Sequence, residues 1–509
     1  MEMNVNIIGA GVSGLAAGCY LQMSGLRTNI FEQTDRFGGL CTSWKRGEYT
    51  FESGIQWLLG SGSANPFHQL WSELLDMNSI NFITHEIRMD IEVKDSHSPN
   101  GDKIFHLYTN LDRLRNYLSA ISPEDQPMID KLIRSMRQMQ SFEIPPMIKK
   151  VPQLMPVNQK IKYIRYLPLL YFLNKIRKET NYSFAGRLKS PFLREAFELL
   201  FDGDELPLMI ITMPLAYGDL EAAGYPIGGA SRFVQKLMEK YLALGGRIHF
   251  KSAVSKIIVE NHRASGLLLE NGDEIRSDLV LSASDWHFTV FDALDGRYVN
   301  IKIRKLGNQK SLKVYYSLVL VSLGIRRSFE GISHFLRFPV DQELVSPDGS
   351  GYSRLESHIY NYDPTLAPEG KTVVSVSFYT RNADYWIHLR ETNKPKYDEV
   401  KKEFAEEVIT LLERKFGKIK GFIEEVDVVT PATLFRYTNN WKGSAQGWLP
   451  GKNLISRSPV DFTLPGLKNF YYASHWSIPG GGLPVALKSA RDAVQILCRD
   501  HGHRFGMDE

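Results

Sequence analysis

The stretch that decides the fold is Val5-Asn6-Ile7-Ile8-Gly9-Ala10-Gly11-Val12-Ser13-Gly14, and an apolar run from Leu15 to Met23 follows it. This stretch predicts a buried strand, a glycine turn and a helix, in the order of a dinucleotide-binding unit. Gly9 permits the tight turn, and Gly11 lets a pyrophosphate approach the backbone. The N–H groups at the start of the helix then face the phosphates.

A second strand is predicted after this helix and ends at Glu32. Glu32 lies at about the ~20-residue offset expected of a carboxylate that binds a ribose. Gly14 and Gly18 are expected to allow close packing of the helix on the strands. A lone glycine triplet also occurs at plain strand–helix corners, but here the strand, the helix and the acid all fit. The pattern therefore predicts a nucleotide site.

Three later stretches carry a resemblance to a known family. Asp35-Arg36-Phe37-Gly38-Gly39-Leu40 supplies a glycine pair and is followed by Phe51-Glu52-Ser53-Gly54; Tyr225 to Gly229 opens a middle block, and Phe470 to Pro484 forms a last one. Their order resembles that of the flavoproteins that include phytoene desaturases, carotenoid isomerases, retinol saturases and amine oxidases. In that group the first glycine motif holds FAD. The resemblance implies noncovalent FAD and is strongest to the carotenoid and retinoid branch.

The resemblance also implies a set of FAD-binding residues. These are Gly9, Gly11, Val12, Ser13, Gly14, Glu32, Gln33, Arg36, Gly38, Gly39, Leu40, Val254, Ser282, Ser474, Gly481, Gly482 and Leu483. Leu40 stands where the family usually has Arg, and Arg36 is a candidate to supply the missing contact. Ser474 stands where the family commonly has Gly. Val254 is expected to reach the adenine through its backbone.

Four residues are candidates to border the flavin ring and to take part in catalysis: Gln56, Trp57, His475 and Trp476. A helix is predicted after Gly482, with Pro484 in its first turn, and its N–H groups are expected to point at the flavin. A packing role for the two Trp residues and a structural role for the histidine stay open. The sequence has no metal-ligand cluster and no nucleophile motif. It also has no second glycine triplet, which leaves NAD(P) without support.

The composition predicts a large enzyme without a nucleic-acid partner. The chain has 509 residues, 43% of them hydrophobic, and a formal net charge of only +4. Cys19, Cys41 and Cys498 are sparse, which is typical of a reducing compartment. No apolar stretch approaches the ~20 residues of a membrane-spanning helix. The sequence therefore predicts a cytoplasmic protein, with peripheral contact at the inner face of the membrane as a further expectation.

The predicted fold class is α/β. A Rossmann-type FAD-binding domain is assembled from residues 1–75, 220–290 and 455–509. An interleaved α+β domain, formed by residues 76–219 and 291–454, is expected to bind the substrate and contact the membrane. Within it, Val314 to Leu323 is predicted as a strand and Asp398 to Phe416 as an amphipathic helix.

The expected membrane contact is the segment from Ile144 to Lys178, which contains no Asp or Glu. Its cations are Lys149, Lys150, Lys160, Lys162, Arg165, Lys175, Arg177 and Lys178, and they alternate with apolar and aromatic residues. Such a pattern suits an anionic bilayer surface. The alternative is a basic helical cap whose apolar run, Leu167 to Leu173, packs inside the protein.

Three classes of function are compatible with these patterns. The leading one is an FAD-dependent oxidoreductase that acts on carbon–carbon bonds of a hydrophobic isoprenoid or polyene, as a desaturase, a saturase or an isomerase. The second is an amine oxidase-like flavoenzyme. The third is a non-catalytic protein that binds prenyl lipids with the same fold. The glycine set, Glu32 and the last block favour the first, and the sequence leaves the oligomeric state open.

Overall fold

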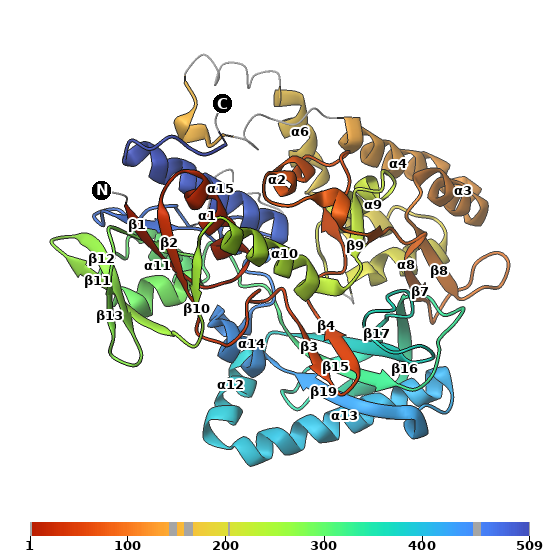
Figure 1. Ribbon diagram of the computed structural model, residues 1–509. Coiled ribbons are helices and arrows are strands. Elements are labelled where there is room, and N and C mark those ends of the chain that lie inside the picture. The colour runs from red at the N-terminus through yellow and green to blue at the C-terminus, as the bar shows by residue number, and fades with distance from the viewer. Residues whose placement is uncertain (1–2, 142–149, 157–165, 202–203, 451–459, 508–509) are drawn as a thin grey trace.

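The computed structural model describes residues 3–141, 150–156, 166–201, 204–450 and 460–507, and it has the predicted α/β architecture (Figure 1). Two large sheets organise the chain, one of five strands and one of seven. The five-stranded sheet draws its strands from three separated parts of the sequence. The exact domain boundaries stay a prediction.

The five-stranded sheet is parallel, in the order β10-β2-β1-β14-β20. Its strands are β1 (Asn4–Ile8), β2 (Arg27–Phe31), β10 (Arg247–His249), β14 (Leu279–Ser282) and β20 (Phe470–Tyr472). Strands from near both ends of the sequence and from its middle are therefore neighbours. β1, β14 and β20 are almost entirely buried, as expected of parallel strands covered on both faces.

Three helices pack together beside this sheet: α1 (Val12–Met23), α10 (Gly229–Ala243) and α15 (Leu483–Asp500) (Figure 1). Gly14 allows the close packing that the sequence predicted, because a Cβ there would lie 2.0 Å from the Gly9 carbonyl oxygen. Gly18 was predicted to allow packing of the helix on the strands, and this partner was wrong. A Cβ at Gly18 would lie 2.5 Å from the Tyr241 ring, so this glycine permits close contact between α1 and α10.

The seven-stranded sheet is mixed, in the order β19-β15-β18-β17-β16-β7-β8. Its strands are β7 (Ile87–Glu92), β8 (Ile104–Tyr108), β15 (Ser317–Ile325), β16 (Phe335–Val345), β17 (Gly351–Ile359), β18 (Thr372–Thr380) and β19 (Ile423–Val429). Apolar side chains of its strands share a core with α12 (Ala383–Thr392) and α13 (Lys394–Phe416). The helix α13 begins before the predicted Asp398, because Asn393 caps it by accepting the Lys396 N–H at 3.1 Å.

The remaining elements connect and cover the two sheets. The short strands are β3 (Ser43–Arg46), β4 (Tyr49–Glu52), β5 (Leu58–Leu59), β6 (Phe82–Ile83), β9 (Ala223–Pro226), β11 (Val254–Glu260), β12 (Arg263–Leu269) and β13 (Glu274–Arg276). The helices are α2 (Phe67–Leu74), α3 (Leu111–Ile121), α4 (Gln126–Ser141), α6 (Leu167–Ile176), α7 (Asn181–Ala185), α8 (Pro191–Glu198), α9 (Met209–Gly218), α11 (Ile301–Gly307) and α14 (Pro431–Thr438). β9 pairs with both β5 and β6, which places the middle block beside the N-terminal segment.

A buried ion pair fixes α15 to α2. The Arg491 guanidinium donates to the Glu73 carboxylate through Nε at 2.7 Å and Nη2 at 2.9 Å. The Tyr20 hydroxyl of α1 donates to the same carboxylate at 2.8 Å. The side chains of Arg491 and Glu73 are both largely buried, so the charge of each is compensated by the charge of the other.

Glu73→Gln is expected to lower the free energy of unfolding by about 3 kcal/mol, because it leaves the Arg491 charge buried without a carboxylate. The matched control is Glu124→Gln, whose carboxylate lies 3.9 Å from Lys189 Nζ in an exposed pair and should contribute less than about 1 kcal/mol. Thermal and urea unfolding of the two variants measure the difference. Equal midpoints would contradict the structural role of the buried pair.

Candidate functional site

Two glycine loops meet at the carboxyl end of β1. The Gly38 N–H donates to the Ala10 carbonyl oxygen at 2.9 Å, and Gly11 and Gly38 pair as an isolated parallel bridge. Gly9, Gly38 and Gly39 have φ angles of +95°, +105° and +61°, in the left-handed region that favours glycine. The second glycine pair therefore lies directly against the first glycine motif.

Glu32 follows β2 and braces the first glycine turn. Its buried carboxylate accepts the Ala10 N–H at 2.9 Å, and it also accepts the Thr34 N–H and hydroxyl at 3.0 and 2.9 Å. Burial raises the pKa of this carboxyl, against the opposing effect of these hydrogen bonds. Its role as a ribose ligand stays a prediction.

The helices α1 and α15 begin next to each other, and each leaves its first N–H groups without a side-chain cap within the described residues. The Ser13 hydroxyl donates to the Ala486 carbonyl oxygen at 3.2 Å and joins the two first turns. Neither first turn contains an acidic residue. Two positive helix ends therefore converge, and such ends bind phosphate groups.

The space at Gly11 fits a bound dinucleotide. Apart from its chain neighbours, a Cβ built there would meet no described atom closer than the Gly38 carbonyl oxygen, at 4.0 Å. Packing within the protein explains why position 14 must be glycine, because a Cβ at Gly14 would clash. The same packing does not explain the glycine at position 11. Open space at a partly exposed backbone, beside two uncapped helix ends, suits the pyrophosphate of FAD.

Glu52 is a residue that the sequence analysis did not single out, and it ties the middle block to the first. This buried carboxylate accepts the N–H of Ala230 at 2.8 Å, at the start of α10, and the N–H of Gly54 at 2.7 Å. A Cβ at Gly229 would lie 2.1 Å from Glu52 Oε2, so glycine is needed for this approach. The available signal was its position beside Gly54 in the quoted motif.

His475 and Trp476 lie in the short turn η10 (His475–Ser477), between β20 and α15. Trp476 is fully buried, donates Nε1–H to Asn440 Oδ1 at 3.0 Å, and packs edge-on against Trp448. His475 Nε2 is buried without a hydrogen-bond partner in the described chain, and burial lowers the pKa of His475 to about 4. Trp476 thus has the surroundings of a packing residue, whereas His475 keeps a neutral ring with one unused nitrogen.

Gln56 and Trp57 lie beyond β4 and face the seven-stranded sheet. Gln56 Nε2 is 3.1 Å from His358 Nε2 on β17, and the Arg88 guanidinium carbon lies 3.9 Å from the centre of the Trp57 ring. Within the described residues, no hydrogen bond or ring contact joins Gln56 or Trp57 to His475 or Trp476. The four predicted ring neighbours therefore lie in two different environments, and their roles in catalysis stay predictions.

The other predicted cofactor residues have varied surroundings. Val254 begins β11 and is buried, the Ser282 hydroxyl bonds to the Thr289 hydroxyl at 2.7 Å, and the Ser474 N–H donates to Ser489 Oγ at 2.9 Å. Arg36 is exposed and lies 3.5 Å from the Asp35 carboxylate. Partly exposed positions in loops or at a helix start are Gln33, Leu40, Gly481, Gly482 and Leu483. Contacts of all these residues with the cofactor stay predictions.

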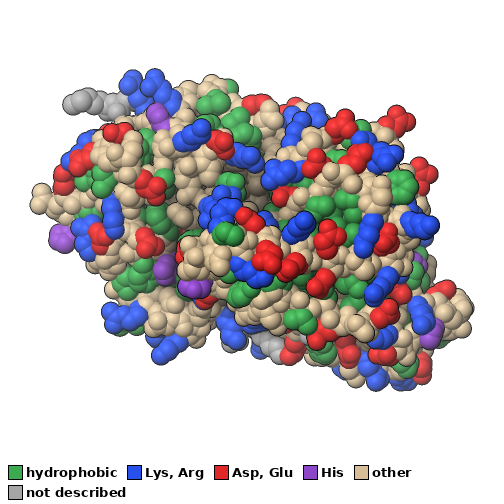
Figure 2. Space-filling model, turned by 90° about the horizontal axis from the view of Figure 1, so that it is seen from below, with side chains coloured by type: hydrophobic (Ala, Val, Ile, Leu, Met, Phe, Trp, Pro, Cys, Tyr) green, Lys and Arg blue, Asp and Glu red, His purple; other side chains and the backbone are tan. Residues whose placement is uncertain are grey.

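Basic and acidic side chains are mixed on the face shown in Figure 2 rather than gathered into one basic patch. That face gives no support to a nucleic-acid partner, which needs clustered positive charge.

Comparisons with known proteins agree with this geometry. The model of the family described as flavin containing amine oxidoreductase matches residues 12–498. The chain is 22% identical to 4,4'-diapophytoene desaturase (4,4'-diapolycopene-forming) from a Methylomonas species, over 99% of this chain and 96% of that protein. It is 23% identical to phytoene desaturase (lycopene-forming) from a Paracoccus species, over 97% of each. It is 24% identical to the chloroplastic prolycopene isomerase of Daucus carota, over 100% of this chain and 80% of that protein.

Solved structures are similar in fold. An oxidoreductase from Methanosarcina mazei has a TM-score of 0.58 at 18% identity, covering 96% of this chain and 99% of that one. A triple mutant of putrescine oxidase has a TM-score of 0.56 at 15% identity, covering 98% and 99%.

Gly11→Ala is expected to fold normally and to lose flavin. The added Cβ enters open space in the protein but occupies the predicted position of the pyrophosphate. Gly421→Ala is the matched control, because Gly421 also has no described atom within 4 Å of a built Cβ and belongs to the turn before β19. Visible absorption of the purified proteins measures flavin content, and thermal unfolding of the flavin-free forms checks folding. Full flavin occupancy in Gly11→Ala would overturn the assignment.

Proposed function

Because the chain belongs to the flavin-containing amine oxidoreductase family, we propose that it is an FAD-dependent oxidoreductase acting on an extended polyene or isoprenoid. The reaction moves hydride to or from a carbon–carbon bond, in a desaturation, a saturation or a redox-neutral isomerisation. The observation that carries the substrate class is the match of almost the whole chain to carotenoid desaturases and isomerases. The similarity to putrescine oxidase concerns the fold and does not favour an amine substrate.

FAD, when bound, supplies the redox chemistry, and the protein supplies its position and surroundings. In this proposal the uncapped start of α1 holds the phosphates, the uncapped start of α15 faces the flavin ring, and Gly11, Gly38 and Gly39 allow the backbone to approach the phosphates. The buried Trp448 and Trp476 pack under the turn before α15 and exclude water from that side. A neutral His475 adds no positive charge there at neutral pH.

The flavin-loaded protein is expected to respond to carotenoid or retinoid polyenes, and small primary amines should be poor substrates. An apolar chain gains about 25 cal/mol per Å² of buried surface, whereas burial of an unpaired ammonium is costly. Anaerobic stopped-flow absorption, with polyenes in detergent and with putrescine, follows the flavin and the product in both flavin redox states. Rapid flavin reduction by putrescine with no polyene response would favour the amine oxidase alternative. A purified protein that takes up no flavin would favour a lipid-binding role.

We also propose peripheral membrane contact through α6. Four cations of the predicted basic segment, Lys149, Lys160, Lys162 and Arg165, lie outside the described residues, but α6 is described. The run from Leu167 to Leu173 does not insert as a unit, because Leu169 and Phe172 are buried in the protein. Leu167 and Tyr171 are 57% and 72% exposed.

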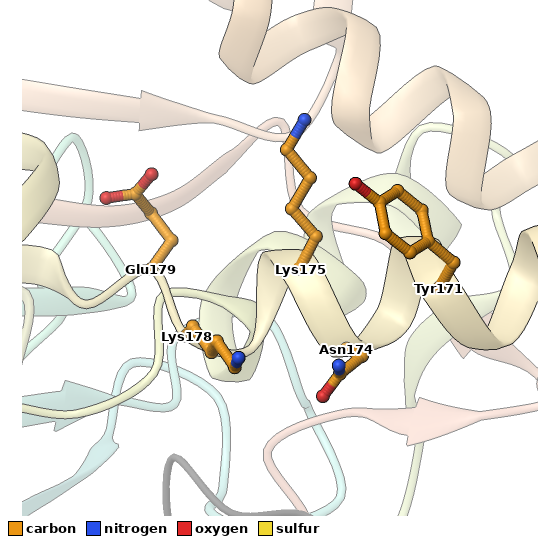
Figure 3. Close-up of a pocket in the computed structure, with 5 residues that line it drawn as sticks. All are labelled: Tyr171, Asn174, Lys175, Lys178 and Glu179. Carbon is orange, nitrogen blue, oxygen red and sulfur yellow. The ribbon is translucent and has the colours of Figure 1, made fainter.

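A shallow surface hollow beside α6 adds cations to this face. Its lining is Tyr171, Asn174, Lys175, Lys178 and Glu179, and Figure 3 shows Tyr171 and Lys175 extending to the same side of the helix. Exposed apolar and aromatic groups beside lysines suit an anionic bilayer surface. No helix in the described part of the chain is long and apolar enough to cross a bilayer. A cytoplasmic location stays a prediction.

Leu167→Ser with Tyr171→Ser is expected to reduce co-sedimentation with anionic vesicles without changing the flavin spectrum. Lys175→Gln with Lys178→Gln should weaken binding about tenfold or more at low salt, since each cation near the surface contributes about 1 kcal/mol. Ile301→Ser is the control, because Ile301 is an equally exposed apolar side chain on α11. A wild-type protein that ignores anionic vesicles at low salt would contradict membrane contact.

A further inference from the structure

A small cavity lies next to Gln56 and Trp57, between the seven-stranded sheet and the helical part of the chain. It is narrow: a water-sized sphere has about 10 Å³ of free space there, roughly the room that one water molecule needs. The segments that line it are the stretch after β4, the end of β6 and start of β7, β9 and the second half of α9. Its polar lining includes Arg88, His85, Thr84 and Thr109, and it includes no Asp or Glu.

Arg88 is a buried cation that forms no hydrogen bond or ion pair with the part of the chain that the structure describes. Arg88 is 8% exposed, and its Nε is buried without a hydrogen bond in the described chain. Within the described residues, no hydrogen bond or ion pair joins the guanidinium to another group. It lies over the face of Trp57, which partly compensates its charge. Burial lowers the pKa of Arg88 to about 10, so the group stays charged at neutral pH.

Glu356, the acid whose charge raises the pKa of Arg88, is already paired with another cation. Glu356 on β17 pairs with Arg337, which lies directly opposite on β16, and it also lies 3.5 Å from His358 Nε2. Burial opposes ionisation of Glu356, but the Arg337 charge, together with the hydrogen bonds from Arg337 and His358 and the His358 charge, outweighs it and lowers the pKa to about 2. Two guanidinium groups therefore share one carboxylate, which leaves one positive charge in excess.

The other titratable groups nearby do not remove this excess. Burial lowers the pKa of His85 to about 4, and it lowers the pKa of the stacked His334 as well, so both rings are neutral at pH 7. Asp363 accepts the Tyr225 hydroxyl at 3.0 Å and the Gly228 N–H at 2.9 Å. Glu52 accepts backbone N–H groups at the start of α10. No described ion pair joins either carboxylate to Arg88.

Further polar side chains line the same cavity as Arg88. His85 Nε2 is buried without a hydrogen bond, and the Thr84 and Thr109 hydroxyls have no hydrogen-bond partner in the described chain. Trp57, Ile83 and Pro214 form apolar parts of the wall. A cation with unused donors in a narrow, otherwise apolar cavity suits one oxygen of a single carboxylate at the end of a ligand, whose charge matches one guanidinium.

We propose that this cavity binds a carboxylate at the end of the substrate, with Arg88 as its charge partner and Thr84 and Thr109 as hydrogen-bond donors. The proposal deepens the proposed function and rests on it, because Gln56 and Trp57 are the residues predicted to border the flavin ring. The substrate is then an apolar chain with one acidic end, rather than a pure hydrocarbon. The carboxylate fixes which carbon atoms lie over the flavin.

The test compares two polyenes that differ only in their end group, all-trans-retinoic acid and all-trans-retinol. Binding to the flavin-loaded protein is followed through tryptophan fluorescence and the flavin spectrum. The wild type is expected to bind the acid at least tenfold more tightly than the alcohol, and Arg88→Met should remove this preference. Arg88→Lys should retain part of it, since the charge remains but the planar fork is lost. An acid-to-alcohol ratio that is the same in wild type and Arg88→Met would overturn the proposal.

Two further measurements separate this proposal from the proposed function. Octanoate and 1-octanol form the same comparison without a polyene, and thermal stabilisation by octanoate that Arg88→Met abolishes supports the subsite even if no polyene reacts. No discrimination with either pair of probes overturns the subsite even if polyenes react.

Arg88→Met should also unfold at the wild-type temperature or above, because it removes an unpaired buried charge, whereas Arg337→Met should unfold at a lower temperature. A large loss of stability in Arg88→Met would assign Arg88 a structural role and overturn the proposal.

Discussion

The parallel register of the five-stranded sheet is the constraint on which the rest of the structure depends. Ile8 lies opposite Ser282, and Ser282 lies opposite Tyr472, so the carboxyl ends of β1, β14 and β20 share one edge. Ligands of open α/β sheets bind at that edge, because the loops and helix starts that follow the strands gather there. The glycine turn after β1 and the glycine turn before α15 therefore become neighbours, although they come from opposite ends of the chain. The hydrogen bond from Ser13 to Ala486 is the direct consequence.

Buried carboxylates then lock distant segments around this edge. Glu32 holds the Ala10 N–H, Glu52 holds the Ala230 N–H, and Glu73 holds the Arg491 guanidinium. Each carboxylate is compensated by donors from another part of the chain, and such charged hydrogen bonds are stronger than neutral ones. Arg88 departs from this pattern, because its charge is buried and no described carboxylate forms a hydrogen bond or an ion pair with it. That contrast with the satisfied carboxylates directs attention to a ligand.

Much of the fold could be predicted from local patterns. The strand, glycine turn and helix from Val5 to Met23 occur where the sequence places them, because their hydrophobic periodicity and turn chemistry are local. The partner of Gly18 and the bracing role of Glu52 were missed, and the burial of Leu169 and Phe172 within α6 agrees with the alternative of a basic cap whose apolar face packs inside, rather than with the leading expectation. Each of these depends on which distant element packs against the residue, and no local pattern carries that information.

The sequence by itself determined the nucleotide-binding unit, the fold class and the family, because glycines that must avoid a side chain and acids at a fixed offset leave a linear signature. The tertiary structure alone decided that Arg337 and Glu356 lie opposite each other on neighbouring strands, and that Arg88 and Trp57 share a cavity wall. Strand register and the approach of separate segments bring these groups together. Since the cost of burying a charge depends on what surrounds it in space, the unpaired Arg88 becomes visible only in the folded chain.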